Sequence, residues 1–260
     1  MNKLDVANRR LELLGKEFET NRCGKCVIVD YKGWEDVFVQ FYQYPNVVRC
    51  HMDSLKKGQV LNKLFPTYLD KGYIGIGAYD SVKDKEAYSL WSSMLGRAYC
   101  KKYHKKRPTY ENVIVCSEWL NFQNFAEWYY KQPFFNAKDY KGKPYQLDKD
   151  ILLKGNKVYS PETCCFVPPE INSLLVKGNN TRGKCLIGVR FNKKLSKYQA
   201  DVRKNGDKVY LGLYNTEIEA FQAYKKAKES YIKEVAERWK DKIDGRVQQA
   251  LINWEIHIND

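Results

Sequence analysis

Hydrophobic and polar positions change period several times along the chain, and each change predicts a different kind of element. Leucines at helical spacing between charged residues predict a short amphipathic helix over residues 3–20. Residues 26–80 then alternate, because β-branched and aromatic runs at 27–31 and 37–41 are separated by glycines. This pattern predicts a small, turn-rich β unit, close in size to an SH3-like barrel.

Helical spacing returns over residues 84–132, where two apolar faces are centred on Trp91 and Trp119. Between them lies the segment 101–107, which holds five Lys or Arg residues and one His. A solvated loop would explain this run, and so would a contact with phosphates that relieves the repulsion between like charges. The candidates for such a DNA contact are Lys101, Lys102, Lys105, Lys106 and Arg107.

Short strands are predicted in the second half of the chain. The pattern over residues 145–175 predicts a strand, a turn, a second strand and the start of a helix. Residues 176–184 have the composition of a linker. Three further short strands are expected over 186–191, 198–203 and 209–214.

Local signals define the C-terminal elements. Asn205-Gly206 is a residue pair that tight hairpin turns prefer. Thr216 is followed three positions later by Glu219, a capping box that predicts a helix from there to about Lys242. A further short helix is expected over residues 247–254.

Composition limits the class of protein without choosing a function. The chain has 260 residues, of which 43% are hydrophobic and 14% aromatic. These values exclude a disordered or collagen-like chain and favour two or three small domains. Neither a signal peptide nor a membrane span is predicted, so we expect a soluble, cytoplasmic protein without a membrane partner.

Eight cysteines raise the question of a metal site. Cys23 and Cys26 have CxxC spacing, and Cys50 with His51 could complete a tetrahedral zinc shell. However, the sequence has no second CxxC and no HxxxH motif, and Cys26 begins a strand pattern. Reduced thiols are therefore the favoured interpretation, and structural zinc is not expected.

The net charge of +14 fits nucleic acid, an anionic membrane surface or an acidic partner. Its distribution favours the first, because residues 178–240 contain 15 Lys or Arg and seven Asp or Glu, a net +8. Arg190, Arg203 and Lys208 alternate onto a strand face that cannot be core. A twisted sheet can lie in the major groove of DNA and present such side chains to phosphates and base edges.

The order and spacing of these residues resemble the AP2 DNA-binding domain, whose pattern is GVR, KWxAxIR, VWLGTF(D/E)T and EEAAxAYD. The matching segments are Gly188-Val189-Arg190, KYQADVR at 197–203, VYLGLYNT at 209–216, Glu219-Ala220 and Ala223-Tyr224. In that family a three-stranded sheet contacts the major groove. The resemblance implies a groove-binding sheet here as well.

Site residues follow from the AP2 resemblance position by position. Arg190 and Arg203 match base- and phosphate-contacting arginines, and Lys208 matches a basic position before the third strand. Tyr210 stands where the family has Trp, and Asp201 stands where Glu is usual, so the base preference stays open. The implied DNA contacts are Arg190, Lys193, Lys194, Lys197, Arg203, Lys208 and Tyr210.

Residues 145–175 resemble the ββα-metal (HNH) core of phage and intron homing endonucleases. The matching residues are LDKD at 147–150, Gly155-Asn156 and YSPETC at 159–164. Related motifs, WxxMLxR and VCxxWxxF, stand upstream at 91–97 and 115–122, which extends the resemblance over residues 88–175. The combination of an HNH core with an AP2 module is itself a pattern of homing endonucleases.

The HNH resemblance implies a catalytic centre for Mg²⁺ or Mn²⁺ at the first of these motifs. Asp148 takes the metal-binding position, Lys149 stands where a general-base His is usual, and Thr163 stands where an Asn ligand is common. Asp150 or Asn172 could complete the metal shell. Lys149 could stabilise the charged transition state of phosphoryl transfer.

Two alternatives stay open for this segment. Asp148 and Asp150 could serve only to brace a hairpin by hydrogen bonds. His104 is a remote candidate for the base, although a polar contact is the simpler interpretation of that side chain. The missing His and Asn favour binding without cleavage, whereas the retained pair of carboxylates favours chemistry.

The expected fold class is α+β with three domains. They are an N-terminal helix plus small β domain at 1–82, an HNH-like domain at 83–176 and an AP2-like domain with C-terminal helices at 177–260. We expect a protein of the phage homing-endonuclease type that binds double-stranded DNA sequence-specifically and cleaves or nicks it with a metal ion. In that case it would act in the cytoplasm of the host cell.

Two other functions fit the same sequence. The first is a catalytically inactive DNA binder that acts as a regulator or as a host-takeover or anti-defence factor. The second is an interaction module whose basic surface binds an acidic host protein.

Overall fold

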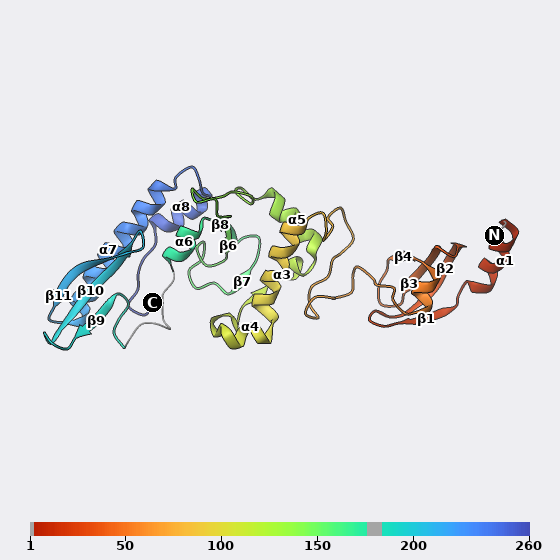
Figure 1. Cartoon of the computed structure of the whole chain (residues 1–260), viewed down its shortest axis with the longest axis horizontal. Coiled ribbons are helices and arrows are strands. Elements are labelled where there is room, and N and C mark those ends of the chain that lie inside the picture. Colours follow the sequence, from red (N-terminus) through yellow and green to blue (C-terminus); the bar gives the residue numbers. More distant parts are fainter. Residues whose placement is uncertain (1–2, 176–183) are drawn as a thin grey trace. The chain divides into compact units, whose positions relative to one another are not determined.

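The structure, a computed structural model, describes residues 3–175 and 184–260 (Figure 1). Nearly all of the predicted linker at 176–184 therefore lies outside the described residues. Packing divides the chain into two compact units, Met1–Glu111 with Val115–Glu127, and Asn112–Ile114 with Trp128–Asp260. Helices and several separate sheets are both present, which confirms the predicted α+β class. The three domain boundaries stay predictions.

The first unit begins with α1 (Lys3–Leu13), which ends earlier than the helix predicted over 3–20. Gly15 has a φ of +79°, a left-handed conformation that commonly ends helices. The following residues form β1 (Glu17–Thr20) and pair with β2 (Gly24–Gly33). The longer helix is therefore wrong, because leucine spacing cannot show that a neighbouring strand is available for pairing.

A four-stranded antiparallel sheet follows, in the order β1-β2-β3-β4, with β3 (Asp36–Phe41) and β4 (Val47–Cys50). Alternate strand residues and the short helix α2 (Met52–Lys56) bury one hydrophobic cluster. Its members are Leu13, Cys23, Cys26, Ile28, Tyr31, Val37, Val39, Phe41, Met52, Leu55 and Val60. The small β unit is confirmed as a sheet, and its SH3-like character stays a prediction.

The helical part of the first unit is centred on two buried tryptophans, as its spacing predicts. Trp91 is fully buried, and its indole Nε1–H donates to the carbonyl of Trp119 at 2.7 Å. The elements are α3 (Lys85–Tyr99), α4 (Lys101–Lys106), η1 (Pro108–Tyr110), η2 (Ser117–Leu120) and the start of α5 (Phe122–Lys131).

The basic run at 101–107 is not the predicted loop, because α4 covers all of it except Arg107. Lysine is a good helix former, and neither Gly nor Pro interrupts the run. Pro108 then ends the helix, since the residue before a proline avoids helical conformation.

The second unit contains the segment that resembles an HNH core. Its elements are Ile114 of β5 (Ile114–Val115), β6 (Gln146–Asp148), β7 (Val158–Tyr159), β8 (Cys165–Val167) and α6 (Pro169–Leu174). β6 pairs antiparallel with β8, and Asp148 lies opposite Cys165. β7 lies between them in sequence but pairs with β5, and the N–H of Ile114 donates to the carbonyl of Lys157. The expected strands and helix exist, but the two that pair are not consecutive.

A three-stranded antiparallel sheet lies near the C-terminus, in the order β11-β10-β9. Its strands are β9 (Val189–Asn192), β10 (Lys197–Lys204) and β11 (Asp207–Tyr214). The long helix α7 (Glu217–Arg238) packs along one face of this sheet, and α8 (Gly245–Ile252) follows it (Figure 1). The predicted arrangement of three strands and a helix is thus present, although α7 ends four residues before Lys242.

Both local signals of this region are confirmed. Thr216 accepts from the N–H of Glu219 through its side chain, and the Glu219 carboxylate accepts from the N–H of Thr216. Asn205 and Gly206 have φ values of +53° and +93°, the left-handed pair of a tight hairpin turn. Over the described residues, no helix combines the length and the apolar character needed to cross a membrane.

Candidate functional site

The solvent side of the C-terminal sheet carries the residues that the AP2 resemblance implies. In β10, Ala200 and Val202 are buried toward α7, so the side chains that alternate with them point the other way. Residues directly opposite one another in a sheet share a face, and the register pairs Arg190 with Gln199, Asp201 with Tyr210, and Arg203 with Lys208. We call these six side chains the basic face.

Asp201 lies at the centre of the basic face and holds two cations. Its Oδ2 is 3.2 Å from Arg190 Nε and 3.1 Å from Lys208 Nζ, and its Oδ1 accepts from Gln199 Nε2 at 2.8 Å. The Asp201 side chain is 12% exposed, against 59% for Arg190 and 47% for Lys208. The carboxylate therefore fixes the positions of the two basic groups while leaving them open to solvent.

The other predicted DNA contacts lie at the edges of the same face. Arg203 Nη1 donates to the carbonyl of Gly206, so its guanidinium lies beside the hairpin turn, and Tyr210 is exposed. Asn192 Oδ1 accepts from the N–H of Lys194 and shapes the turn between β9 and β10. Lys193, Lys194 and Lys197 are exposed at this turn.

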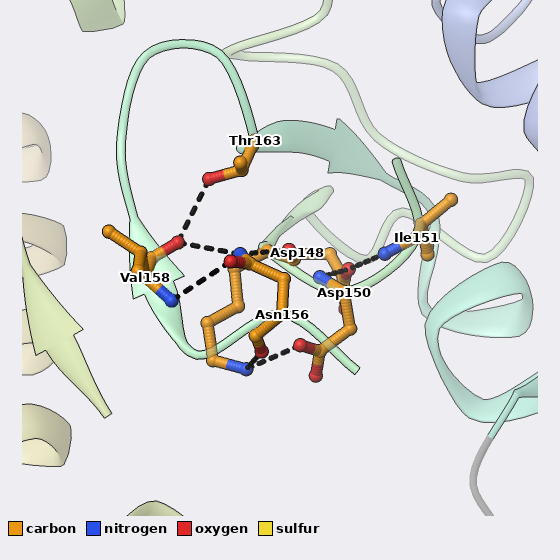
Figure 2. A network of polar contacts seen from close by, with 7 residues as sticks. Asp148, Asp150, Ile151, Asn156, Val158 and Thr163 are labelled. Atoms are coloured by element: carbon orange, nitrogen blue, oxygen red, sulfur yellow. Dashed lines mark hydrogen bonds and ion pairs between the residues drawn. The ribbon is translucent and has the colours of Figure 1, made fainter. Parts of the chain in front are cut away.

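Asp148, the last residue of β6, begins the segment 148–164, which we call the Asp148 turn (Figure 2). Its Oδ1 accepts from the N–H groups of Asp150 at 2.7 Å and Ile151 at 2.8 Å. Burial raises the pKa of the Asp148 carboxyl, and these two hydrogen bonds act in the opposite direction. Its Oδ2 has no hydrogen-bond partner within the described residues.

Lys149 points into the protein and is bound there on several sides. Its side chain is 7% exposed, and Nζ lies 2.5 Å from Asp150 Oδ1. The same group donates to the carbonyl of Asn156 at 3.0 Å and lies 5.8 Å from the centre of the Tyr159 ring. Lys149 and Asp150 thus balance one another's charge. This ion pair was not predicted from the sequence.

Asn156 connects the two halves of the Asp148 turn, as Figure 2 shows. Its Nδ2 donates to the carbonyls of Lys149 at 2.8 Å and Val158 at 2.7 Å. Thr163 Oγ1 donates to the Val158 carbonyl at 2.9 Å and lies 3.1 Å from Ser160 Oγ. Asn156 was not among the predicted site residues. The Gly155-Asn156 pair within the HNH-like motif could have pointed to it.

Most of the residues predicted to hold a metal have contacts within the protein. Asp150 is bound to Lys149, Thr163 is bound within the turn, and Asn172 Nδ2 donates to Gln146 Oε1 at 2.6 Å. Gln146 lies two residues from Asp148 along β6, which is about 7 Å at strand spacing. Asp148 Oδ2 and Asp150 Oδ2 take no part in these contacts, and a cation shared by the two carboxylates stays a prediction. Elsewhere in the described residues, no group of three or more His, Cys, Asp or Glu could hold a metal.

The first unit holds the remaining predicted contacts. Lys101, Lys102, Lys105, Lys106 and Arg107 are all exposed on or just after α4. His104 does not share this exposure, because its Nε2 lies 2.8 Å from the carbonyl oxygen of Arg97. The five cations are available to an anionic partner, and His104 helps to anchor α4 to α3.

The cysteines considered for zinc belong to the core of the N-terminal sheet. Cys23 and Cys26 are buried in its hydrophobic cluster, and Cys23 Sγ accepts from the N–H of Asn62 at 3.4 Å. Burial raises the pKa of the Cys26 and Cys50 thiols to about 11. These thiols are therefore protonated near neutral pH and pack as small apolar groups.

Comparison with known proteins adds no family to this picture. No protein-family model matches the chain, and no curated protein or solved structure gives a significant match. The likeness to AP2 and HNH proteins therefore rests on the motifs quoted above.

Proposed function

We propose that the chain binds double-stranded DNA sequence-specifically through the basic face of the C-terminal sheet. The observation that carries this proposal is the position of Asp201, which holds Arg190 and Lys208 on an exposed face while α7 covers the other face. Side chains that are fixed before binding lose less conformational entropy on contact. They can also discriminate between the donor and acceptor patterns of base edges in the major groove.

The flanking lysines fit a second part of DNA recognition. Lys193, Lys194 and Lys197 are exposed at one end of the basic face. Cations in such turns commonly contact phosphates, which sets the register of a protein on the duplex without selecting sequence. The proposal therefore assigns base contacts to the centre of the face and phosphate contacts to its edge.

The test compares two double variants of the full chain, each with two positive charges removed. A duplex selected from a random pool is titrated with the parent, with Arg190→Ala/Arg203→Ala and with Lys226→Ala/Lys233→Ala, at several salt concentrations. Lys226 and Lys233 are exposed on α7 and are the matched control. We expect the arginine pair to lose about tenfold or more in affinity and to flatten the salt dependence by about one phosphate contact, because Arg203 lies at the edge of the face and Arg190 at its centre.

A smaller loss is expected for the lysine pair, because it only weakens the general field of the module. Equal affinity and salt dependence for the parent and the arginine pair would contradict the proposal. So would an equal loss in both variants, since that result would show that only total charge matters.

Metal-dependent cleavage or nicking is a second candidate function, and the observation in its favour is that the hydrogen bonds of the Asp148 turn use only Oδ1 of Asp148. The contacts of Lys149, Asp150 and Thr163 within the Asp148 turn favour the alternative, a DNA binder without cleavage that acts as a regulator. Supercoiled DNA incubated with Mg²⁺ or Mn²⁺ distinguishes the two. Nicking by the parent that Asp148→Ala abolishes would establish cleavage.

A further inference from the structure

The second unit contains a cavity of about 540 Å³ that neither candidate site uses. One wall is formed by the segment 134–145, and the facing wall by the end of α7 and the residues after it, 238–242. Glu170 of α6 and Asn205 of the β10–β11 turn complete the lining. Its volume lies within the range of about 300–1,000 Å³ that is typical of small-molecule sites.

Four aromatic rings line this cavity, and packing within the protein does not explain the position of one of them, Tyr140. Phe134 and Tyr145 are stacked with ring centres 6.1 Å apart, and Tyr140 lies 6.2 Å from Trp239. Tyr140 is 74% exposed, which is unusual for so large a ring. Aromatic walls of this kind suit a flat ligand that stacks, such as a nucleobase.

Two of the four rings, those of Trp239 and Tyr145, are held in place by hydrogen bonds. Trp239 Nε1–H donates to Glu170 Oε2 at 3.0 Å, and Arg238 binds Glu170 Oε1. The Tyr145 hydroxyl donates to the carbonyl of Lys242 at 2.9 Å. Arg238 also balances the charge of Glu170, one of the three carboxylates in the lining.

Positive charge surrounds the aromatic walls. The lining has three cations, Lys138, Arg238 and Lys242, and three carboxylates, Asp139, Glu170 and Asp241. The excess of positive charge comes from Lys141, Lys143 and Lys240, which lie close to the lining residues in sequence. Lys141 Nζ lies over the Tyr140 ring, 5.3 Å from its centre, so a cation lies against one face of this exposed ring. A ligand that is both flat and anionic matches this combination, and a nucleotide has both properties.

From this arrangement we propose that the cavity binds a single nucleotide whose base is not stacked in a duplex. The base lies against the aromatic walls, and the phosphate contacts the surrounding lysines. Two sources have this chemistry: a free mononucleotide, and an unpaired nucleotide in DNA held by the basic face. The second source rests on the proposed DNA-binding function, and Asn205 supports it, because the turn that lines the cavity joins the strands that carry Arg203 and Lys208.

The experiment measures three ligands with the full chain: dAMP, a fully paired duplex, and the same duplex with one bulged nucleotide. Tyr140→Ala removes the exposed ring, and Tyr42→Ala is the matched control, since Tyr42 is a 61% exposed tyrosine of the N-terminal sheet. We expect the parent to bind the bulged duplex at least fivefold more tightly than the paired one, because base–aromatic stacking of about 1–3 kcal/mol corresponds to such a factor or more. Tyr140→Ala should lose this preference, and Tyr42→Ala should keep it.

The outcomes separate the two sources and the two proposals. Binding of dAMP that depends on Tyr140, without a preference for the bulge, supports the site with a free nucleotide as ligand. Suppose that the parent binds the paired duplex, and that Tyr140→Ala changes neither the binding of dAMP nor the preference for the bulged duplex. The nucleotide site is then refuted, and the DNA-binding proposal stands. If no duplex binds but dAMP does so through Tyr140, the DNA-binding proposal fails and the nucleotide site stands.

Discussion

Gly188 takes a conformation and a space that no other residue fits. Its φ is +76°, and a Cβ built there would lie 2.0 Å from the ring of Tyr224. The residue lets β9 approach α7 closely, which helps the sheet to pack on the helix. The AP2 resemblance marks this glycine as part of a motif, but only the structure supplies the physical reason for it.

Gly188→Ala should therefore destabilise the second unit by on the order of 2–4 kcal/mol, from backbone strain and overpacking together. Gly142→Ala is the control, because Gly142 has a similar φ of +73° and nothing within 4 Å of an added Cβ. It should lose only about 1 kcal/mol, the backbone part alone. Urea unfolding followed by circular dichroism measures both, and equal losses would contradict the role of the Tyr224 ring.

At Asp148, a sequence motif could not predict which contacts the neighbouring side chains make. The motif placed Asp148, Lys149 and Asp150 together, and the structure keeps them together. It could not show that Lys149 points inward and neutralises Asp150, because that depends on the carbonyl of Asn156 and the ring of Tyr159. Such a pairing is decided by tertiary packing, which a run of three residues does not contain.

At the scale of elements, the sequence predicted best where a local signal and the hydrophobic period agreed. The hairpin at Asn205-Gly206 and the start of α7 at the Thr216 capping box both follow from contacts within a few residues. The predicted end of the first helix, at residue 20, was wrong, and so was a loop over 101–107. In each case the decisive factor lay outside the period: a strand partner for residues 17–20, and the helix propensity of lysine.

In the three-stranded sheet, Asp201 positions two exposed cations, and this contact leads to a prediction. Asp201→Asn removes a negative charge from the centre of the basic face and releases Arg190 and Lys208. Affinity for random duplex should rise, with a salt dependence steeper by about one phosphate contact. Preference for a selected duplex should fall by about tenfold, since base discrimination needs the two cations held in place.

Asp207→Asn provides the control, because Asp207 begins β11 in the same sheet and is exposed. It changes the net charge equally and leaves the contacts of Asp201 in place. Fluorescence anisotropy with a selected and a random duplex measures both effects. If the two variants change the preference equally, Asp201 acts through charge and not through positioning.

At the scale of the whole molecule, each packing unit has a core of its own. Each unit also has a buried cysteine whose reactivity can be used to follow its unfolding. Cys26 lies in the core of the first unit, and Cys164 lies buried in the second. Burial raises the pKa of Cys26 to about 11 and that of Cys164 to about 12. Both thiols are therefore protonated and shielded in the folded chain, and they react with an alkylating agent only after local unfolding.

We expect the two units to unfold separately, since units with their own cores are the usual units of cooperative unfolding. Short alkylation pulses at increasing urea, followed by mass spectrometry of the peptides, give one midpoint for Cys26 and another for Cys164. Gly188→Ala should then lower the Cys164 midpoint and leave that of Cys26 unchanged, because Gly188 and Tyr224 both belong to the second unit. A common shift of both midpoints would show instead that the two units unfold as one.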